Sequence, residues 1–168
     1  CTDFLQEGQE VFTLEKLFRL EWGIDLRNVL APMELKKRIL FVVEHVSRLA
    51  GMENFGAYLT MLLEIDAFFL NEDRHMNNIA VLRNLNRTFS YCPVFDNGAA
   101  LFSDTCISYD LELPLETCYE RIEAKPFNRS FDEQMDVAEE LYGVHFYYWF
   151  MEKDVERLLS GAKEAYGA

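Results

Sequence analysis

Two successive runs of apolar residues at helical spacing constrain the fold more than any other feature of the sequence. In the first run, apolar side chains recur every three or four positions, and charged side chains lie mostly between them. These apolar residues are Leu35, Ile39, Val42, Val46 and Leu49. Gly51 ends this run, and a second run extends from about Glu53 to Leu70. Because such spacing places the apolar residues on one helix face, the sequence predicts two long helices that share a core.

Shorter signals predict further helices on both sides of this pair. Thr13–Trp22 is expected to be helical, with Thr13 as a cap and Gly23 as the stop. After the pair, 99–129 is irregular and acidic, although Leu115–Ile122 could form a short helix. The sequence thus favours a mainly helical chain that is interrupted by one long irregular segment.

The C-terminal part also has a helical pattern. Ser130 and Glu133 fit the capping box, in which a hydroxyl and a carboxylate satisfy backbone donors at a helix start. The helix is expected to reach about Tyr142 and to end at Gly143. In 144–166, one or two closing helices are expected, with apolar side chains broadly on one side and a run of aromatic residues in the core. The residues of this group are Phe146, Tyr147, Tyr148, Trp149, Phe150, Met151, Val155, Leu158 and Leu159.

A polar loop and a β-hairpin lie near the middle of the chain. Residues 71–78 have almost no aliphatic side chain and are expected to form a loop. The β-prone runs Ile79–Leu82 and Phe89–Phe95 are joined by Arg83–Thr88, whose asparagines suit a turn. Pro93 lacks the N–H that a ladder needs, so the second strand lies at an edge or its pairing ends there. We expect an α+β fold that is mainly α-helical and has one β-hairpin.

Length and charge exclude several classes of protein. The chain has 168 residues, enough for one compact domain with its own core. Its 29 acidic and 16 basic residues give a net charge of −13, which argues against direct binding of nucleic acid. No uncharged stretch approaches the ~20 residues that cross a bilayer, and no secretory signal is visible. The four cysteines form no CxxC pair. We therefore expect a cytoplasmic protein with free thiols, without a zinc site and without membrane contact.

Three polar residues suggest a site for chemistry. Asp73 and Asn78 lie in the polar loop, and Asp96 follows the predicted hairpin. Because a hairpin brings its two ends together, these residues are expected to converge. Asn78 and Asp96 offer the hard oxygen ligands that Mg²⁺ prefers, and Asp73 would be free to orient a hydroxyl and accept its proton. Asp66 lies on the apolar face of its helix, where we expect it to accept hydrogen bonds from the loop backbone or from Arg74.

The strings FLNEDRHMNNIAVL and PVFDNGAALF resemble the catalytic loop and the metal-binding loop of HipA-type and CtkA-type bacterial protein kinases. These kinases are themselves similar here to phosphatidylinositol kinases. The shared pattern is D-R-H-x-x-N, a hairpin, and D-N-G. The resemblance implies that Asp73 is the catalytic aspartate. His75 occupies a matching position in the catalytic loop, where we expect it to orient the loop rather than to accept a proton or to be an ordinary polar residue. The resemblance also implies that Asn78 and Asp96 hold Mg²⁺ and, through it, the phosphates of ATP.

The same resemblance implies that residues 1–168 are the large, C-terminal lobe of a serine/threonine protein kinase. Residues 1–10 would then be a remnant of the hinge, and 71–98 would hold the catalytic loop, hairpin and metal-binding loop. The small ATP-binding lobe, with its glycine-rich loop, is expected upstream, on a separate chain, or nowhere. Expected partners are a nucleotide, a protein substrate, and a separately encoded small lobe or antitoxin-like protein. Alone, the chain is expected to bind nucleotide weakly and to turn over slowly.

Other interpretations stay open at this point. The chain could be a kinase-derived interaction module that has lost its chemistry. It could also be a metal-dependent phosphoester hydrolase with Asp73, His75 and Asp96 as ligands. A lipid substrate is disfavoured because no basic cluster faces a membrane. Phosphorylation of Ser103, Thr105 or Ser108 is disfavoured because that stretch contains no arginine to receive a phosphate.

Overall fold

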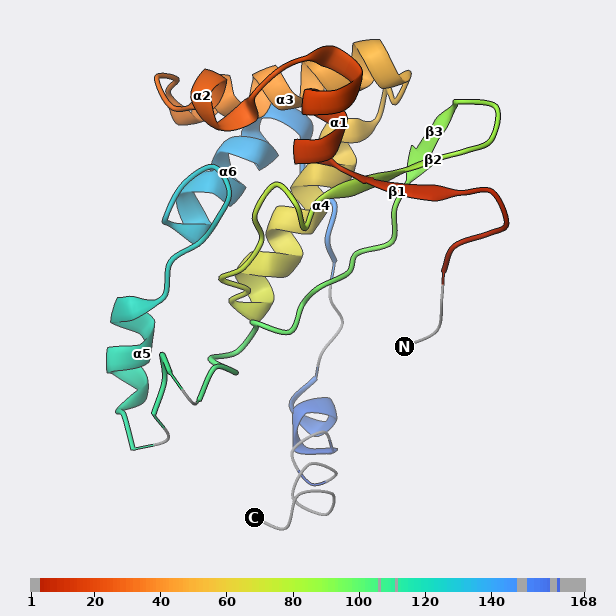
Figure 1. Ribbon diagram of the computed structural model, residues 1–168. Coiled ribbons are helices and arrows are strands. Elements are labelled where there is room, and N and C mark those ends of the chain that lie inside the picture. The colour runs from red at the N-terminus through yellow and green to blue at the C-terminus, as the bar shows by residue number, and fades with distance from the viewer. Residues whose placement is uncertain (1–3, 106, 111, 148–150, 158–159, 161–168) are drawn as a thin grey trace.

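The computed structural model describes residues 4–105, 107–110, 112–147, 151–157 and 160 (Figure 1). Over these described residues the fold is α+β and mainly helical, with seven helices and one small three-stranded antiparallel sheet. In chain order the labelled elements are β1 (Glu10–Thr13), α1 (Leu14–Trp22), α2 (Leu26–Leu30), α3 (Leu35–Ala50), α4 (Phe55–Phe69), β2 (Ala80–Arg83), β3 (Phe89–Tyr91), α5 (Leu115–Arg121) and α6 (Phe131–Tyr142). A further helical segment covers 152–157.

The two long helices predicted from periodicity are confirmed as α3 and α4. Gly51 ends α3 in the left-handed conformation, with φ at 69°, which glycine adopts without steric cost. Helix α4 packs most extensively against α6 and also contacts α3 (Figure 1). The apolar faces of α1, α3 and α4 meet in one core in which side chains such as Leu17, Val42 and Leu59 are fully buried. Each such side chain stabilises the fold by about 1.5–3 kcal/mol.

The predicted helix caps are present, with one difference. The Thr13 hydroxyl accepts a hydrogen bond from the Lys16 N–H, and Gly23 ends α1. The Ser130 hydroxyl likewise accepts from the Glu133 N–H at 3.2 Å. The reciprocal half of that capping box is missing, because the Ser130 N–H donates to the Asn128 side chain instead. Asn128 therefore takes the place of Glu133 in closing the start of α6.

The sheet has one strand more than the sequence predicted. The expected hairpin is formed by β2 and β3, and β1 pairs antiparallel with the other edge of β2. Strand β1 is short and lies directly before α1, so its residues have no alternating run long enough to distinguish it from a linker. Strand β3 is an edge strand and ends at Tyr91, two residues before Pro93, in agreement with the prediction. The first residues of the fold are thus tied to the hairpin that follows the polar loop.

In the part of 144–166 that the structure describes, the expected packing is present at Phe146, whose ring centroid lies 5.7 Å from that of Phe68 in α4, but not in the helical segment that follows. Residues 152–157 are helical, but they are mostly exposed, as are Tyr147 and Met151 (Figure 1). Five of these six residues are charged, so the segment has too little apolar surface to cover the core. Five predicted members of the aromatic and apolar group lie outside the described residues. They are Tyr148, Trp149, Phe150, Leu158 and Leu159. Among the described helices, none is both long and apolar enough to span a bilayer.

Candidate functional site

A buried ion pair lies beneath the polar loop. The Arg74 Nε is 2.8 Å from Asp66 Oδ2, and Arg74 Nη2 is 2.9 Å from Asp66 Oδ1. Both side chains are fully buried, and the Asn71 amide also donates to Asp66 at 2.8 Å. Burial raises the pKa of the Asp66 carboxyl, whereas the hydrogen bonds from Arg74 and Asn71 oppose that shift. The expectation that Asp66 accepts hydrogen bonds from Arg74 is confirmed.

Arg74 also joins the two loops that the sequence predicts to converge. Its Nη1 donates to the backbone oxygen of Asn78 at 2.9 Å and to that of Phe95 at 2.8 Å. Its Nη2 contacts the side-chain oxygen of Asn97. One guanidinium therefore binds the end of α4, the loop after it and the D-N-G segment. Because the fork of N–H donors is planar and rigid, these segments are held in a fixed arrangement.

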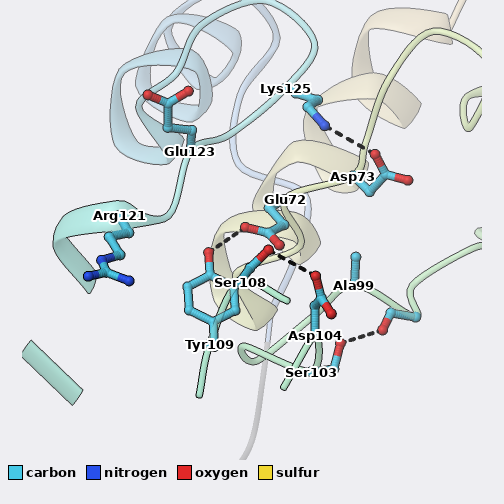
Figure 2. Close-up of a pocket in the computed structure, with 11 residues that line it drawn as sticks. Glu72, Asp73, Ala99, Ser103, Asp104, Ser108, Tyr109, Arg121, Glu123 and Lys125 are labelled. Atoms are coloured by element: carbon cyan, nitrogen blue, oxygen red, sulfur yellow. Dashed lines mark hydrogen bonds and ion pairs between the residues drawn. The ribbon is translucent and has the colours of Figure 1, made fainter. Parts of the chain in front are cut away.

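Asp73 lies on the outer side of this arrangement. Its side chain is 45% exposed, and Lys125 Nζ lies 3.1 Å from Asp73 Oδ1 (Figure 2). On the other oxygen, His75 Nε2 lies 3.7 Å from Asp73 Oδ2. His75 Nδ1 accepts a hydrogen bond from the Asn77 N–H, so in a neutral imidazole the proton is on Nε2. The Asp73 carboxylate is thus accessible and flanked by two nitrogen donors.

Asn78 and Asp96 each retain an oxygen that no described residue binds. The Asn78 amide nitrogen donates to the backbone oxygen of Asp73 at 2.9 Å, which leaves its Oδ1 without a hydrogen bond within the described chain. No buried side-chain oxygen lacks a partner there, so this Oδ1 reaches solvent. Asp96 is exposed, and its carboxylate makes no hydrogen bond or ion pair with the described residues. Both oxygens are therefore available to a ligand.

The free oxygens of Asn78 and Asp96 are hard donors, the type of ligand that Mg²⁺ prefers. Among the described residues, no three His, Cys, Asp or Glu side chains form a group that could hold a metal ion. Mg²⁺ commonly takes one or two carboxylates and completes its shell with water and substrate phosphates. One carboxylate from Asp96 and one amide oxygen from Asn78 match that donor set.

A cavity of about 710 Å³ opens between the polar loop and the segment from 98 to 125 (Figure 2). Four carboxylates line it against two cationic side chains. The carboxylates belong to Glu72, Asp73, Asp104 and Glu123, and the cations to Arg121 and Lys125. This cavity is therefore acidic overall, and any phosphate that enters it needs a compensating cation.

The irregular segment is bound to the loop through Tyr109. Its hydroxyl donates to a Glu72 carboxylate oxygen at 2.5 Å, and burial together with this carboxylate raises the pKa of Tyr109. Ser103 and Ser108 line the same cavity as Arg121. The sequence argument against a phosphate-binding arginine considered only neighbours along the chain, whereas the fold brings an arginine to this cavity from α5.

Lys125 is the functional candidate that sequence reasoning missed. The backbone beside its peptide bond to Pro126, which is cis, is fixed from both sides. Gln134 of α6, fully buried, donates to the Lys125 backbone oxygen at 2.9 Å, and Arg38 of α3 donates to the Phe127 backbone oxygen at 2.8 Å. A weak signal was available, because Lys125 is one of only three basic residues in the acidic segment 99–129.

Comparisons with models of protein families, with curated proteins and with solved structures found no significant match. The likeness of residues 66–102 to kinase loops therefore depends on the residues themselves and on the contacts described above.

Proposed function

We propose that this chain is the phosphotransfer lobe of an ATP- and Mg²⁺-dependent kinase, whose acceptor is a serine or threonine hydroxyl of a protein. The two loops resemble those of HipA- and CtkA-type kinases. One observation supports this most strongly: the buried Arg74 side chain binds both the loop that presents Asp73 and Asn78 and the loop that presents Asp96. Phosphoryl transfer depends mainly on positioning and charge neutralisation, so fixed loops with accessible oxygens suit it.

In this proposal each residue has a separate role. Asp73 orients the acceptor hydroxyl and takes its proton as the acceptor oxygen bonds to the γ-phosphorus of ATP and the bond to the ADP oxygen breaks. His75 holds the Asp73 carboxylate from its second oxygen. Asn78 and Asp96 would hold Mg²⁺, which when bound neutralises phosphate charge.

Lys125 adds a positive charge where the transferred group would lie. Its ammonium touches Asp73, and the cavity beside it is otherwise rich in carboxylates. A phosphoryl group that approached Asp73 without this charge would meet net repulsion. Lys125 therefore has the position of a phosphate contact, although it comes from a segment far from the loop in sequence.

Nucleotide binding with and without Mg²⁺ tests the proposal. It should be measured by calorimetry on this chain and on a longer chain that includes upstream sequence, because a second lobe would strengthen binding. Asp96→Asn should weaken Mg²⁺-dependent ATP binding at least about tenfold, since it removes the only carboxylate ligand proposed. Its backbone is left-handed, with φ at 57°, which asparagine tolerates well.

A matched control and the contrary outcomes are available. Asp132→Asn changes an exposed carboxylate on α6 that does not line the cavity beside Asp73, and it should leave binding unchanged. ATP binding that needs no metal and survives Asp96→Asn would contradict the proposal. Phosphoester hydrolysis without ATP would favour the hydrolase, and an absence of nucleotide binding by the longer chain would favour an interaction module.

A further inference from the structure

A second cavity, of about 680 Å³, opens on the other side of Lys125. Its walls come from α1, α2, the start of α3, residues 75–77 of the polar loop, and Lys125 with Pro126. Three basic side chains line it, those of Arg27, Arg38 and Lys125, and Glu15 is the one lining carboxylate within the described chain. In a protein with a net charge of −13, this cavity is basic, whereas its neighbour is acidic.

Lys125 is paired with Asp73, but the other two cationic side chains of this cavity have no carboxylate partner within the described chain. The Arg38 guanidinium donates to backbone oxygens of Met33 at 2.8 Å, Phe127 at 2.8 Å and Ala31 at 3.5 Å. These carbonyls fix the side chain but bring no negative charge. Arg27 is exposed, and its side chain forms no hydrogen bond or ion pair with the described residues. Two cations are thus available to an anionic ligand, and one of them is rigidly placed.

The basic cavity shares one lining residue with the acidic cavity beside Asp73. Lys125 is the one described residue that lines both cavities, and it touches Asp73 Oδ1. His75, which lies beside the other Asp73 oxygen, also lines the basic cavity. A peptide whose hydroxyl reached Asp73 would therefore place its neighbouring side chains in this cavity.

We propose that the basic cavity binds acidic side chains of the phosphoacceptor protein, next to the serine or threonine that receives the phosphoryl group. This inference depends on the proposed function, because it names the substrate class of that same site. The volume lies within the about 300–1,000 Å³ of ordinary ligand pockets, and the charge is complementary to aspartate and glutamate. The net negative charge of the protein disfavours acidic segments over most of its surface, so a cavity with unpaired arginines is a favoured place for them.

Fluorescence anisotropy with labelled serine peptides tests the inference without requiring turnover. One peptide has glutamates on both sides of the serine, and its partner has lysines at the same positions. The acidic peptide should bind at least about tenfold more tightly at low salt, and the difference should shrink as salt screens the charges. Arg27→Glu should weaken binding of the acidic peptide at least about tenfold, and Arg27→Gln should weaken it by a smaller factor.

Arg19→Glu is the matched control, because Arg19 is an exposed arginine of the neighbouring helix α1 and lines neither cavity. This variant should bind the acidic peptide within about twofold of the unchanged protein. Equal losses for Arg27→Glu and Arg19→Glu would overturn the inference, because they would reflect overall charge rather than the cavity. Preference for the lysine peptide would overturn it too, as would tighter binding of an RNA oligonucleotide at the same site.

Failure of this inference is distinguishable from failure of the proposed function. Mg²⁺-dependent ATP binding that is lost in Asp96→Asn, together with indifference to peptide charge, would reject the acidic substrate and leave the kinase proposal standing. Acidic-peptide binding that needs Arg27, without any nucleotide binding by the longer chain, would leave a peptide-binding cavity and reject the kinase. Loss of both would reject both proposals.

Discussion

Asp73 and Arg74 are neighbours in the chain, yet the fold uses them in opposite ways. The Arg74 side chain is fully buried and binds oxygens from three segments. The Asp73 side chain is about half exposed, and its partners among the described residues are the side chains of Lys125 and His75. A ligand could displace either partner. The loop therefore has an inner layer that maintains the structure and an outer layer that is free for chemistry.

Two other carboxylates show the same division. Asp66 is buried and receives hydrogen bonds from Arg74 and Asn71, so its charge is satisfied within the protein. Asp96 is exposed and unbound by the described residues, on a backbone with positive φ. A buried charge without a partner is costly, whereas an exposed one is not. Substitutions in the inner layer should thus affect stability, and those in the outer layer should affect ligands.

The largest effect is expected for Arg74→Met, which leaves the Asp66 carboxylate buried without its ion-pair partner. The free energy of unfolding should fall by about 3–5 kcal/mol, measured by urea denaturation. Arg129→Met removes an arginine whose ion pair with Glu123 is well exposed, and it should cost less than about 1 kcal/mol. Comparable losses for the two variants would show that the inner layer does not stabilise the fold.

Asp73→Asn should affect phosphoryl transfer strongly and stability very little. Phosphoryl transfer to a serine peptide, measured with the longer chain, should slow by about 10²–10⁴-fold because the proton acceptor is lost. The free energy of unfolding should change by no more than about 0.5 kcal/mol, since the side chain is exposed. A loss of stability as large as that of Arg74→Met would abolish the distinction between the layers.

Lys125→Met tests whether Lys125 belongs with Asp73 to the outer layer. Its ion pair with Asp73 is half exposed on both sides, so its loss should hardly change stability. Transfer should slow by about tenfold while the KM for ATP changes less, because the lysine is proposed to contact the transferred group. Lys125→Arg should restore part of the rate. Equal rates for the Met variant and the unchanged protein would remove Lys125 from the mechanism.

The smallest expected effect is on the pH dependence of stability, and it involves the buried thiol of Cys92. Burial raises the pKa of its thiol to about 11 from an ordinary value of 9.0. Above pH 9 the unfolded chain releases a proton that the folded protein retains, so stability should fall as pH rises from about 9 towards 11. Urea denaturation at pH 8.5 and 9.5 should show a shallower decline for Cys92→Ala. An unchanged slope would mean that this thiol is not protected by the fold.

The sequence predicted the elements whose signal is local and repetitive. Helices α3 and α4 follow from apolar residues on one face, and the caps at Thr13 and Ser130 follow from hydroxyl chemistry. The pairing of Asp66 with Arg74 was also predictable, because a carboxylate on an apolar helix face needs a donor nearby. These features depend on residues that lie within a few turns of one another.

Features that depend on distant segments were not predictable in the same way. Strand β1 has four residues, and its pairing is with β2, which lies beyond α4 in the chain. Lys125 reaches Asp73 from a distant segment whose backbone is fixed by Gln134 of α6 and Arg38 of α3. In the charged segment 152–157, helical periodicity predicts both a helix and its packing, but only the helix is found. The segment is too polar to pack against the core.

Strand β1 couples the N-terminal residues of the fold to the polar loop that holds Asp73. Beyond its pairing with β2, the junction between β1 and α1 bonds directly to the polar loop and its end: the Leu14 N–H donates to the Ile79 backbone oxygen at 2.8 Å, and the Glu15 N–H to that of Met76 at 3.3 Å. Through these bonds, a displacement of β1 would shift Met76, the neighbour of His75. A domain or partner that bound the residues before Glu10 would therefore be able to change the position of the loop that holds Asp73 and His75.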